Sequence, residues 1–333
     1  MKKILFFGEC LIRITPDRFS FVGDKIKSTI YFGGSELNVA RNLSGFGVKT
    51  DFFTGLPDND IGLKFKNFME ENRIGANLVE NCGSRVGIYY LEEGIGERAS
   101  EVFYDRSNTS INDIEIKNLE YDKIFEDVEI FHFSGITVGI SEKVRNILKE
   151  LLSEAKKRNI KVSMDLNFRK KMLSILEAKK FFSEIARDVD ICFGIEPIKA
   201  SDDDLNMFKR NSATDSDIKD RMEVLKNKYS FKNIFHTVRI KDEYGKNIYY
   251  AYEMSDTGFK KSRDFICENM GRIGSGDAFV SGVLYKIITG KEEEALDFGV
   301  ASGSYKCTIE GDSMFVGANK IEKIINIGTS LER

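Results

Sequence analysis

Residues 130–164 read IFHFSGITVGISEKVRNILKELLSEAKKRNIKVSM, which is the pattern of a strand, a helix and a second strand. Ile130–Phe133 and Ile160–Met164 are short apolar runs, typical of strands that are buried on both faces. Between them, apolar residues recur every three or four positions, as on the buried face of an amphipathic helix. These residues are Val144, Ile147, Leu148, Leu151, Leu152 and Ala155. The stretch therefore predicts two parallel strands joined by a helix.

The same alternation extends in both directions along the chain. A helical pattern over Glu36–Phe46 precedes Gly47, and glycine commonly follows a helix C-terminus. Further strand patterns occur at Ile4–Phe7, Lys49–Thr54, Ile191–Phe193 and Phe235–Val238. We therefore expect an α/β fold with a mostly parallel, doubly wound sheet and helices on both faces.

Two stretches, residues 11–32 and 87–107, interrupt this rhythm. Both contain alternating, aromatic-rich segments with no helical pattern between them, which predicts antiparallel strands in a small separate sheet. Because the chain leaves the predicted core twice to form this sheet, the sheet is a candidate lid. The predicted division is a core of residues 1–10, 33–86 and 108–333 and a β-lid of residues 11–32 and 87–107.

The composition excludes several classes of function. The 333 residues include 50 basic and 53 acidic side chains, so the net charge of −3 gives no reason to expect nucleic acid or a membrane surface as a partner. The five cysteines form no CxxC pair, and with two histidines they provide no metal-ligand cluster. The apolar N-terminal run Ile4–Phe7 is too short for a signal peptide. We therefore expect a cytoplasmic protein with reduced thiols.

The strongest chemical signal is Gly271-Arg-Ile-Gly-Ser-Gly-Asp-Ala-Phe279, which enters an apolar helix. Gly274 and Gly276 leave backbone N–H groups free to approach an anion, and the helix places the positive end of its dipole there. Asp277 follows the glycine turn and is placed to accept a proton from a hydroxyl beside the anion. The alternative is that Asp277 only caps the helix.

A second signal is Gly33-Gly-Ser-Glu-Leu-Asn38. A pair of glycines that opens a helix allows a ligand to contact the backbone, and Asn38, one turn later, would face that ligand. The alternative is a tight turn between a strand and a helix, with Asn38 on the surface.

In their sequences, order and separation, these two segments resemble the signature regions of the PfkB (ribokinase) family of carbohydrate kinases, and the resemblance covers nearly the whole chain. Within that family the chain is most similar to the group of 2-keto-3-deoxygluconate kinases. The segments that carry this second resemblance are Gly8–Arg13, Gly87–Glu92, Val102–Arg106, Phe133–Ile136, Asp165–Arg169 and Lys306–Asp312. The resemblance implies a ribokinase-like fold and phosphorylation of a small sugar acid.

The resemblance also implies roles for individual positions. Asp277 would be the general base, and Gly274, Ser275 and Gly276 would form the anion hole for the transferring phosphoryl group. The sugar acid would be held by Gly34, Asn38, Tyr89, Tyr104, Arg106 and Arg169.

The implied cofactors are ATP and Mg²⁺. Asn167, Thr237 and Arg239 would lie on the nucleotide side together with Gly274 and Gly276, and Glu196 would act on the metal indirectly. The expected partners are the sugar acid and ATP, with no nucleic acid and no membrane. We also expect a homo-oligomer that forms through the lid.

Three positions depart from the family pattern. Gly271 replaces an Asp, Phe193-Gly194-Ile195-Glu196 stands in place of an Asn-x-x-Glu motif of which only Glu196 remains, and the segment 236–245 lacks the usual pair of glycines. Two alternatives therefore stay open. One is a related kinase that acts on a neutral sugar or a sugar phosphate, and the other is a sugar-binding regulator that has lost the chemistry.

Overall fold

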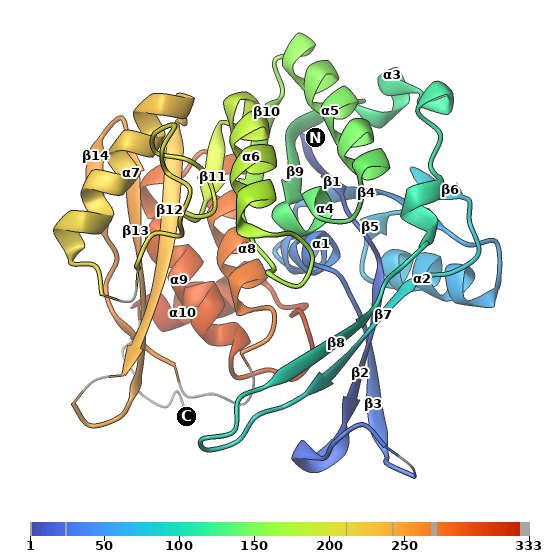
Figure 1. Cartoon of the computed structure of the whole chain (residues 1–333), viewed down its shortest axis with the longest axis horizontal. Helices are drawn as coiled ribbons and strands as arrows, with labels where there is room; N and C mark the ends of the chain where they lie inside the picture. Colours follow the sequence, from blue (N-terminus) through green and yellow to red (C-terminus); the bar gives the residue numbers. More distant parts are fainter. Residues whose placement is uncertain (1, 24, 211, 242, 268–271, 327–333) are drawn as a thin grey trace.

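The structure is a computed structural model that describes residues 2–23, 25–210, 212–241, 243–267 and 272–326. Eleven strands of this described part form one large sheet in the order β14-β13-β12-β11-β10-β9-β1-β4-β5, with β15 beside β13 and β6 beside β4 (Figure 1). Their bounds are β1 Lys3–Phe7, β4 Lys49–Leu56, β5 Ile74–Gly75, β6 Val79–Asn81, β9 Val128–Ser134, β10 Lys161–Asp165, β11 Ile191–Phe193, β12 Asn233–Lys241, β13 Asn247–Ser255, β14 Gly258–Lys261 and β15 Phe265–Ile266.

The strands from β12 to β5 pair in parallel, whereas β13 pairs antiparallel with β12 and with both of its other neighbours. The helices are α1 Ser35–Gly45, α2 Asp60–Glu71, α3 Tyr121–Ile124, α4 Gly135–Val138, α5 Glu142–Lys157, α6 Ile175–Ile185, α7 Asp215–Tyr229, α8 Ser275–Ile288, α9 Ala295–Lys306 and α10 Ala318–Asn326. The predicted fold class, a mostly parallel sheet between helices, is confirmed.

Two hydrophobic clusters cover opposite faces of this sheet. In β1, Leu5 and Phe7 belong to one cluster and Ile4 and Phe6 to the other, because successive side chains of a strand point to opposite faces. Helices α5, α6 and α7 contribute to the first cluster, and α1, α8 and α9 contribute to the second (Figure 1). A strand buried on both faces explains why the β1 sequence is apolar throughout.

Helix α5 illustrates how the local sequence determines the ends and the buried face of a helix. The Ser141 hydroxyl accepts a hydrogen bond from the Val144 N–H (3.2 Å), which satisfies one of the free donors of the first turn. Its last turn carries Lys156 and Lys157, whose charges suit the negative end of the helix dipole. The apolar face between these ends is buried as predicted.

A second sheet of four strands, in the order β3-β2-β7-β8, extends away from the core (Figure 1). Its strands are β2 Leu11–Pro16, β3 Ser28–Gly33, β7 Gly87–Glu92 and β8 Glu101–Asp105. We predicted antiparallel strands, and this was wrong for one pair, since β2 and β7 are parallel. Both strands start at the core and run outward, because the chain returns to the core between them. The separate sheet itself is confirmed, whereas its action as a lid stays a prediction.

Within the described part of the chain, no helix has the length and apolar character needed to cross a membrane.

Candidate active site

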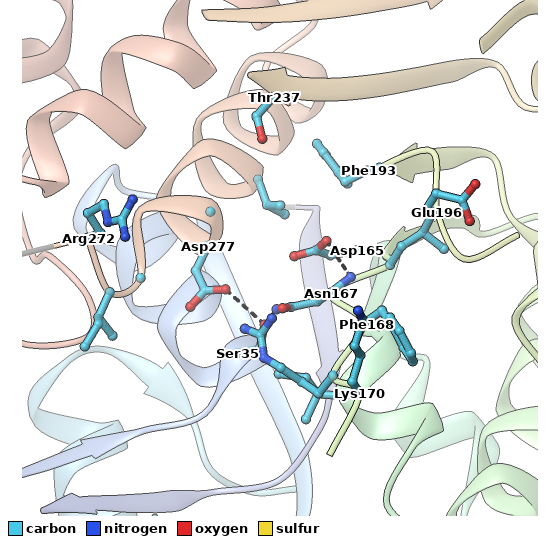
Figure 2. A pocket seen from close by; sticks show the side chains of 18 of the residues that line it. Ser35, Asp165, Asn167, Phe168, Lys170, Phe193, Glu196, Thr237, Arg272 and Asp277 are labelled. Carbon is cyan, nitrogen blue, oxygen red and sulfur yellow. Dashed lines mark hydrogen bonds between the residues drawn. The ribbon is translucent and has the colours of Figure 1, made fainter. Parts of the chain in front are cut away.

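A cavity of about 1340 Å³ lies between the inner face of the small sheet and the carboxyl ends of the core strands. The core side includes Asp165, Phe193 and Thr237 from β10, β11 and β12, and the small sheet contributes Leu91 and Tyr104. In open α/β sheets, ligands bind at the carboxyl ends of the strands. The cavity is therefore the candidate active site, and Figure 2 shows part of its lining.

The glycine loop at the start of α8 forms one wall of the cavity. Gly274 is the N-cap residue and has a φ of 72°, and a Cβ added there would lie 1.6 Å from the Asp312 carbonyl oxygen. Only glycine fits this position without a shift of the backbone. Gly276 and Asp277 follow in the first turn, where a helix offers no acceptor for their N–H groups. This geometry leaves backbone donors for an anion at the loop, and the anion hole itself stays a prediction.

Asp277 does not cap α8, because hydrogen bonds from other elements hold its carboxylate. Ser35 Oγ donates to Asp277 Oδ1 (3.0 Å), and Asn38 Nδ2 donates to Asp277 Oδ2 (2.7 Å). Asn167 Nδ2 in turn donates to Ser35 Oγ (2.9 Å). Figure 2 shows Asp277 pointing toward Ser35 at the cavity wall. The Asp277 carboxylate is fixed in place and still lines the cavity.

Burial raises the pKa of Asp277 to about 6, although the hydrogen bonds from Asn38 and Ser35 and the charge of Arg169 act in the opposite direction. A carboxylate with this pKa is ionised at pH 7 to 8 and is a stronger base than an exposed Asp. General bases work best when their pKa lies near the working pH. These properties suit proton acceptance from a hydroxyl.

The predicted sugar-binding residues Gly34, Asn38, Tyr89 and Tyr104 all line the cavity. Gly34 has a φ of 129°, and a Cβ there would lie 2.2 Å from the Glu9 carbonyl oxygen, so no larger residue fits. The Tyr89 hydroxyl donates to Asp312 Oδ2 (2.8 Å), and the ring centroids of Tyr89 and Tyr104 are 6.3 Å apart.

Arg106 and Arg169 also line the cavity, but their surroundings differ. Arg106 forms an ion pair with Glu9, to which its Nε donates (2.9 Å). Among the described residues, no hydrogen bond or ion pair occupies the Arg169 guanidinium, which is exposed to the cavity. Arg169 is close enough to Asp277 and Asp165 to lower the pKa of both. It is therefore a cation that a ligand can reach.

On the predicted nucleotide side, Asn167 and Thr237 line the cavity, whereas Arg239 does not. Ser275, which we predicted for the anion hole, is also absent from the cavity lining. Arg239 Nη2 donates to Ser275 Oγ (2.7 Å), and its guanidinium lies 4.3 Å from the centroid of the Tyr249 ring. Ser275 Oγ donates to the Arg272 carbonyl (2.6 Å), so Arg239 and Ser275 hold the loop from outside the cavity. The departure at Gly271 lies outside the described residues.

Glu196 lines the cavity, but cations already hold its carboxylate. Lys179 Nζ and Arg221 Nη2 lie 2.9 and 2.6 Å from its two oxygens. Phe193, at the position of the motif's Asn, also lines the cavity, and Gly194 after it has a φ of 104°, a left-handed conformation that favours glycine. In the described ranges, no group of three or more His, Cys, Asp or Glu side chains is arranged to hold a metal ion. A Mg²⁺ ion at this site would depend on phosphate oxygens and water, which is its usual behaviour in kinases.

Two residues of the site received no role from the sequence. Ser35 connects Asn167 to Asp277. Asp165 lines the cavity, and its pKa is raised to about 7 by desolvation and by the charge of Asp277. In the sequence, Ser35 could have been found from its place in the turn that opens a helix. Asp165 could have been found from its place at the end of a core strand.

Comparisons with known proteins identify a family and several relatives. A model of the pfkB family carbohydrate kinases matches residues 1–315. A protein of Haloferax volcanii named 2-dehydro-3-deoxygalactonokinase is 26% identical over 327 residues, which are 98% of this chain and 97% of that protein. A protein of Bacillus subtilis named 5-dehydro-2-deoxygluconokinase is 24% identical over 89% of this chain and 86% of its own length.

Among solved structures, that of 2-dehydro-3-deoxygluconokinase from Thermotoga maritima is similar, with a TM-score of 0.88, 26% identity and 97% of each chain covered. The family match includes the small sheet, the glycine loop and every candidate residue named above.

Proposed function

This chain belongs to the pfkB family of carbohydrate kinases, which are phosphotransferases with an alcohol acceptor, and from that premise we propose a sugar acid as its substrate. The most suitable acceptor is 2-keto-3-deoxygluconate, also called 2-dehydro-3-deoxygluconate, with ATP as the phosphoryl donor. The observation that carries this proposal is the guanidinium of Arg169, which has no ion pair among the described residues and lies in the same cavity as the Asp277 carboxylate. The names of the relatives from H. volcanii and T. maritima support it.

In the proposed reaction, the 6-hydroxyl of the sugar acid attacks the γ-phosphorus of ATP. Asp277 accepts the hydroxyl proton, a P–O bond forms to the sugar, and the bond to ADP breaks. The N–H groups of Gly276 and Asp277 stabilise the charge on the transferring phosphoryl group. Phosphoryl transfer depends mainly on positioning and charge stabilisation, and the fixed Asp277 carboxylate and rigid Gly274 turn provide both.

Mg²⁺ would neutralise phosphate charge during the transfer. The Asp165 carboxylate has no ion pair within the described residues and would hold a water ligand of the ion. Glu196 suits direct coordination less well, because Lys179 and Arg221 already hold it. Because ATP is a cytoplasmic metabolite, we also propose a cytoplasmic location.

The pocket favours a sugar acid over the alternatives. A neutral sugar would leave Arg169 without a partner, and planar bidentate recognition of a carboxylate is a task that arginine performs well. A regulator without activity would have no use for a carboxylate whose pKa is raised toward neutrality.

The test is a screen of ADP release with Mg·ATP and a panel of acceptors. The panel contains 2-keto-3-deoxygluconate, its galactonate epimer, neutral hexoses and hexose phosphates. We expect the highest kcat/KM for one of the two keto-deoxy acids. A higher kcat/KM for a hexose phosphate, or no turnover of any acceptor, would contradict the proposal.

We also propose that residues 11–32 and 87–107 act as a lid that closes over the bound ligands. Closure would exclude water, which otherwise competes as the phosphoryl acceptor. Addition of sugar acid with a non-hydrolysable ATP analogue should slow amide hydrogen exchange in the described parts of β2, β7 and β8 more than in β9 and β10. Equal slowing in both sheets would contradict closure.

The outer face of the small sheet suggests that this sheet also joins two copies of the chain. Ile30, Ile14, Tyr90 and Phe103 lie in register across the four strands. Ile30 is 62% exposed and Phe103 is 42% exposed, which is unusual for apolar side chains in one row. We propose a homo-oligomer formed through this row.

Ile30→Lys should therefore dissociate the oligomer, because it places a charge in an apolar contact. Sedimentation equilibrium of the wild type and the variant measures the change in mass. Leu176→Lys is the matched control, since Leu176 is 61% exposed on α6. A monomeric wild type, or equal effects of the two substitutions, would rule out this interface.

A further inference from the structure

Glu9 lies at the junction between the core and the small sheet. The chain crosses this junction four times, and Glu9 belongs to the first crossing, between β1 and β2. Its carbonyl oxygen is 2.2 Å from where a Cβ of Gly34 would lie, and its Oε1 is 3.0 Å from where a Cβ of Gly87 would lie. Its side chain accepts hydrogen bonds from Arg106 and from the Thr109 hydroxyl. Gly34 belongs to the second crossing, Gly87 to the third, and Arg106 and Thr109 to the fourth, so Glu9 contacts all of them.

The ion pair of Glu9 with Arg106 is shielded from water. The side chains are 4% and 9% exposed, respectively, and both Nε and Nη2 of Arg106 donate to Glu9 Oε2. Nη1 of Arg106 donates to Met172 Sδ (3.3 Å), an acceptor without charge. Arg106 lines the cavity, so it can still offer N–H groups to a ligand, but Glu9 offsets its positive charge.

Arg13 of β2, which is not part of the cavity lining, is neutralised in a similar way. Its Nε lies 3.0 Å from Asp312 Oδ1, and the two side chains are 3% and 1% exposed. Arg169 is the third arginine near the sugar end, and among the described residues no carboxylate forms an ion pair with it. Of these three arginines, Arg169 is thus the one without an ion pair among the described residues, although its charge still acts on Asp165 and Asp277. A ligand with a single negative charge can therefore form an ion pair with it.

We propose that Glu9 is a specificity-determining residue, which neutralises Arg106 so that the sugar end selects a singly charged acid over a doubly charged sugar phosphate. This inference rests on the proposed function for the location of the sugar end. Other charged groups line the cavity, namely Asp165, Asp277, Glu101, Glu196, Lys170, Lys171, Lys209, Arg210 and Arg272. They are unchanged in the variants below, so their contribution cancels when the ratio of the two anions in a variant is compared with that ratio in the wild type.

Titration calorimetry with the full chain tests the proposal, with gluconate as the singly charged probe, glucose 6-phosphate as the doubly charged probe and glucose as the neutral one. The quantity of interest is the ratio of the two anion dissociation constants. Glu9→Gln preserves the shape of the side chain and leaves Arg106 uncompensated. We expect the ratio to shift toward glucose 6-phosphate by about 10- to 100-fold, as for one additional charge within several ångströms at a protein surface.

Glu9→Gln/Arg106→Gln removes both charges and should return the ratio to that of the wild type. Glu253→Gln is the matched control, because Glu253 is also 4% exposed and is held by Asn233 away from the cavity. It should leave the ratio unchanged. If Glu9 had only a structural role, its substitution would weaken the binding of all three probes equally and would not alter the ratio.

An unchanged ratio in Glu9→Gln, a shift toward gluconate, or failure of the wild type to bind either anion would overturn the proposal. If Glu9→Gln does not fold, Arg106→Gln alone decides, because it should weaken both anions relative to glucose by about tenfold or more. A shifted ratio in a protein that does not phosphorylate sugar acids would uphold charge selection and reject the proposed reaction. Turnover of the sugar acid with an unchanged ratio would uphold the proposed reaction and reject charge selection.

Discussion

Asp277→Asn is expected to lower kcat by about 10²- to 10⁴-fold, the usual contribution of a positioned general base. The amide keeps the size of the side chain and can still accept the hydrogen bond from Ser35, but it cannot take up a proton at neutral pH. Binding of ATP and of the sugar acid should change little. Steady-state kinetics with calorimetric binding separates these two effects.

The pH dependence provides a second readout of the same group. Because the pKa of Asp277 is about 6 in the folded protein, kcat/KM of the wild type should fall as the pH drops below 6, when the base becomes protonated. The variant should lack this acidic limb. A variant with near-wild-type kcat would contradict the assignment of Asp277 as the base.

Loss of fold can be distinguished from loss of chemistry through the same pKa. An acid whose pKa is raised on folding binds more protons in the folded state, so its contribution to stability decreases as the pH rises from about 4 through 6. At pH 8 the buried charge of Asp277 therefore disfavours folding. Asp277→Asn should have a Tm no lower than that of the wild type at pH 8, which thermal unfolding measures.

Arg169→Ala is expected to lower kcat/KM for 2-keto-3-deoxygluconate by about 10- to 150-fold. The estimate follows from a charge-assisted hydrogen bond of roughly 1.5–3 kcal/mol, converted to a ratio of binding constants. An analogue with an alcohol in place of the carboxylate should be a poor substrate of the wild type and should lose far less in the variant. Parallel kinetics with the two acceptors measures this difference.

Arg145→Ala is the matched control for this substitution. Arg145 donates to one carbonyl, that of Val138 (3.0 Å), lies 4.2 Å from the centroid of the Phe181 ring, and is absent from the cavity lining. It should leave kcat/KM for both acceptors unchanged. Equal losses for the acid and its neutral analogue in Arg169→Ala would mean that Arg169 serves ATP or the fold, and the sugar-acid assignment would lose its main support.

The sequence predicted those features that depend on local pattern. The apolar run Ile4–Phe7 indicated a strand buried on both faces, and the structure divides its side chains between the two clusters. The glycine loop and Asp277 were recognisable because their spacing is short.

Features that depend on contacts between distant segments were not predictable in this way. The pairing of Glu9 with Arg106 joins residues 97 positions apart, and nothing in either segment indicates the other. The position of Arg239 outside the cavity depends on the packing of β12 against α8, which no periodicity encodes. The parallel direction of β2 and β7 depends on the path of the chain through the core between them.

That parallel pairing also constrains the order in which the chain folds. A hairpin such as β2–β3 can form from neighbouring residues, but β7 reaches β2 only after residues 33–86 have crossed the core sheet. Contacts between segments far apart in sequence form slowly, because the intervening chain must first be ordered. The small sheet is therefore expected to assemble late, on a core that is already native, and a fragment that ends before β7 would leave the β2–β3 hairpin without its central neighbour.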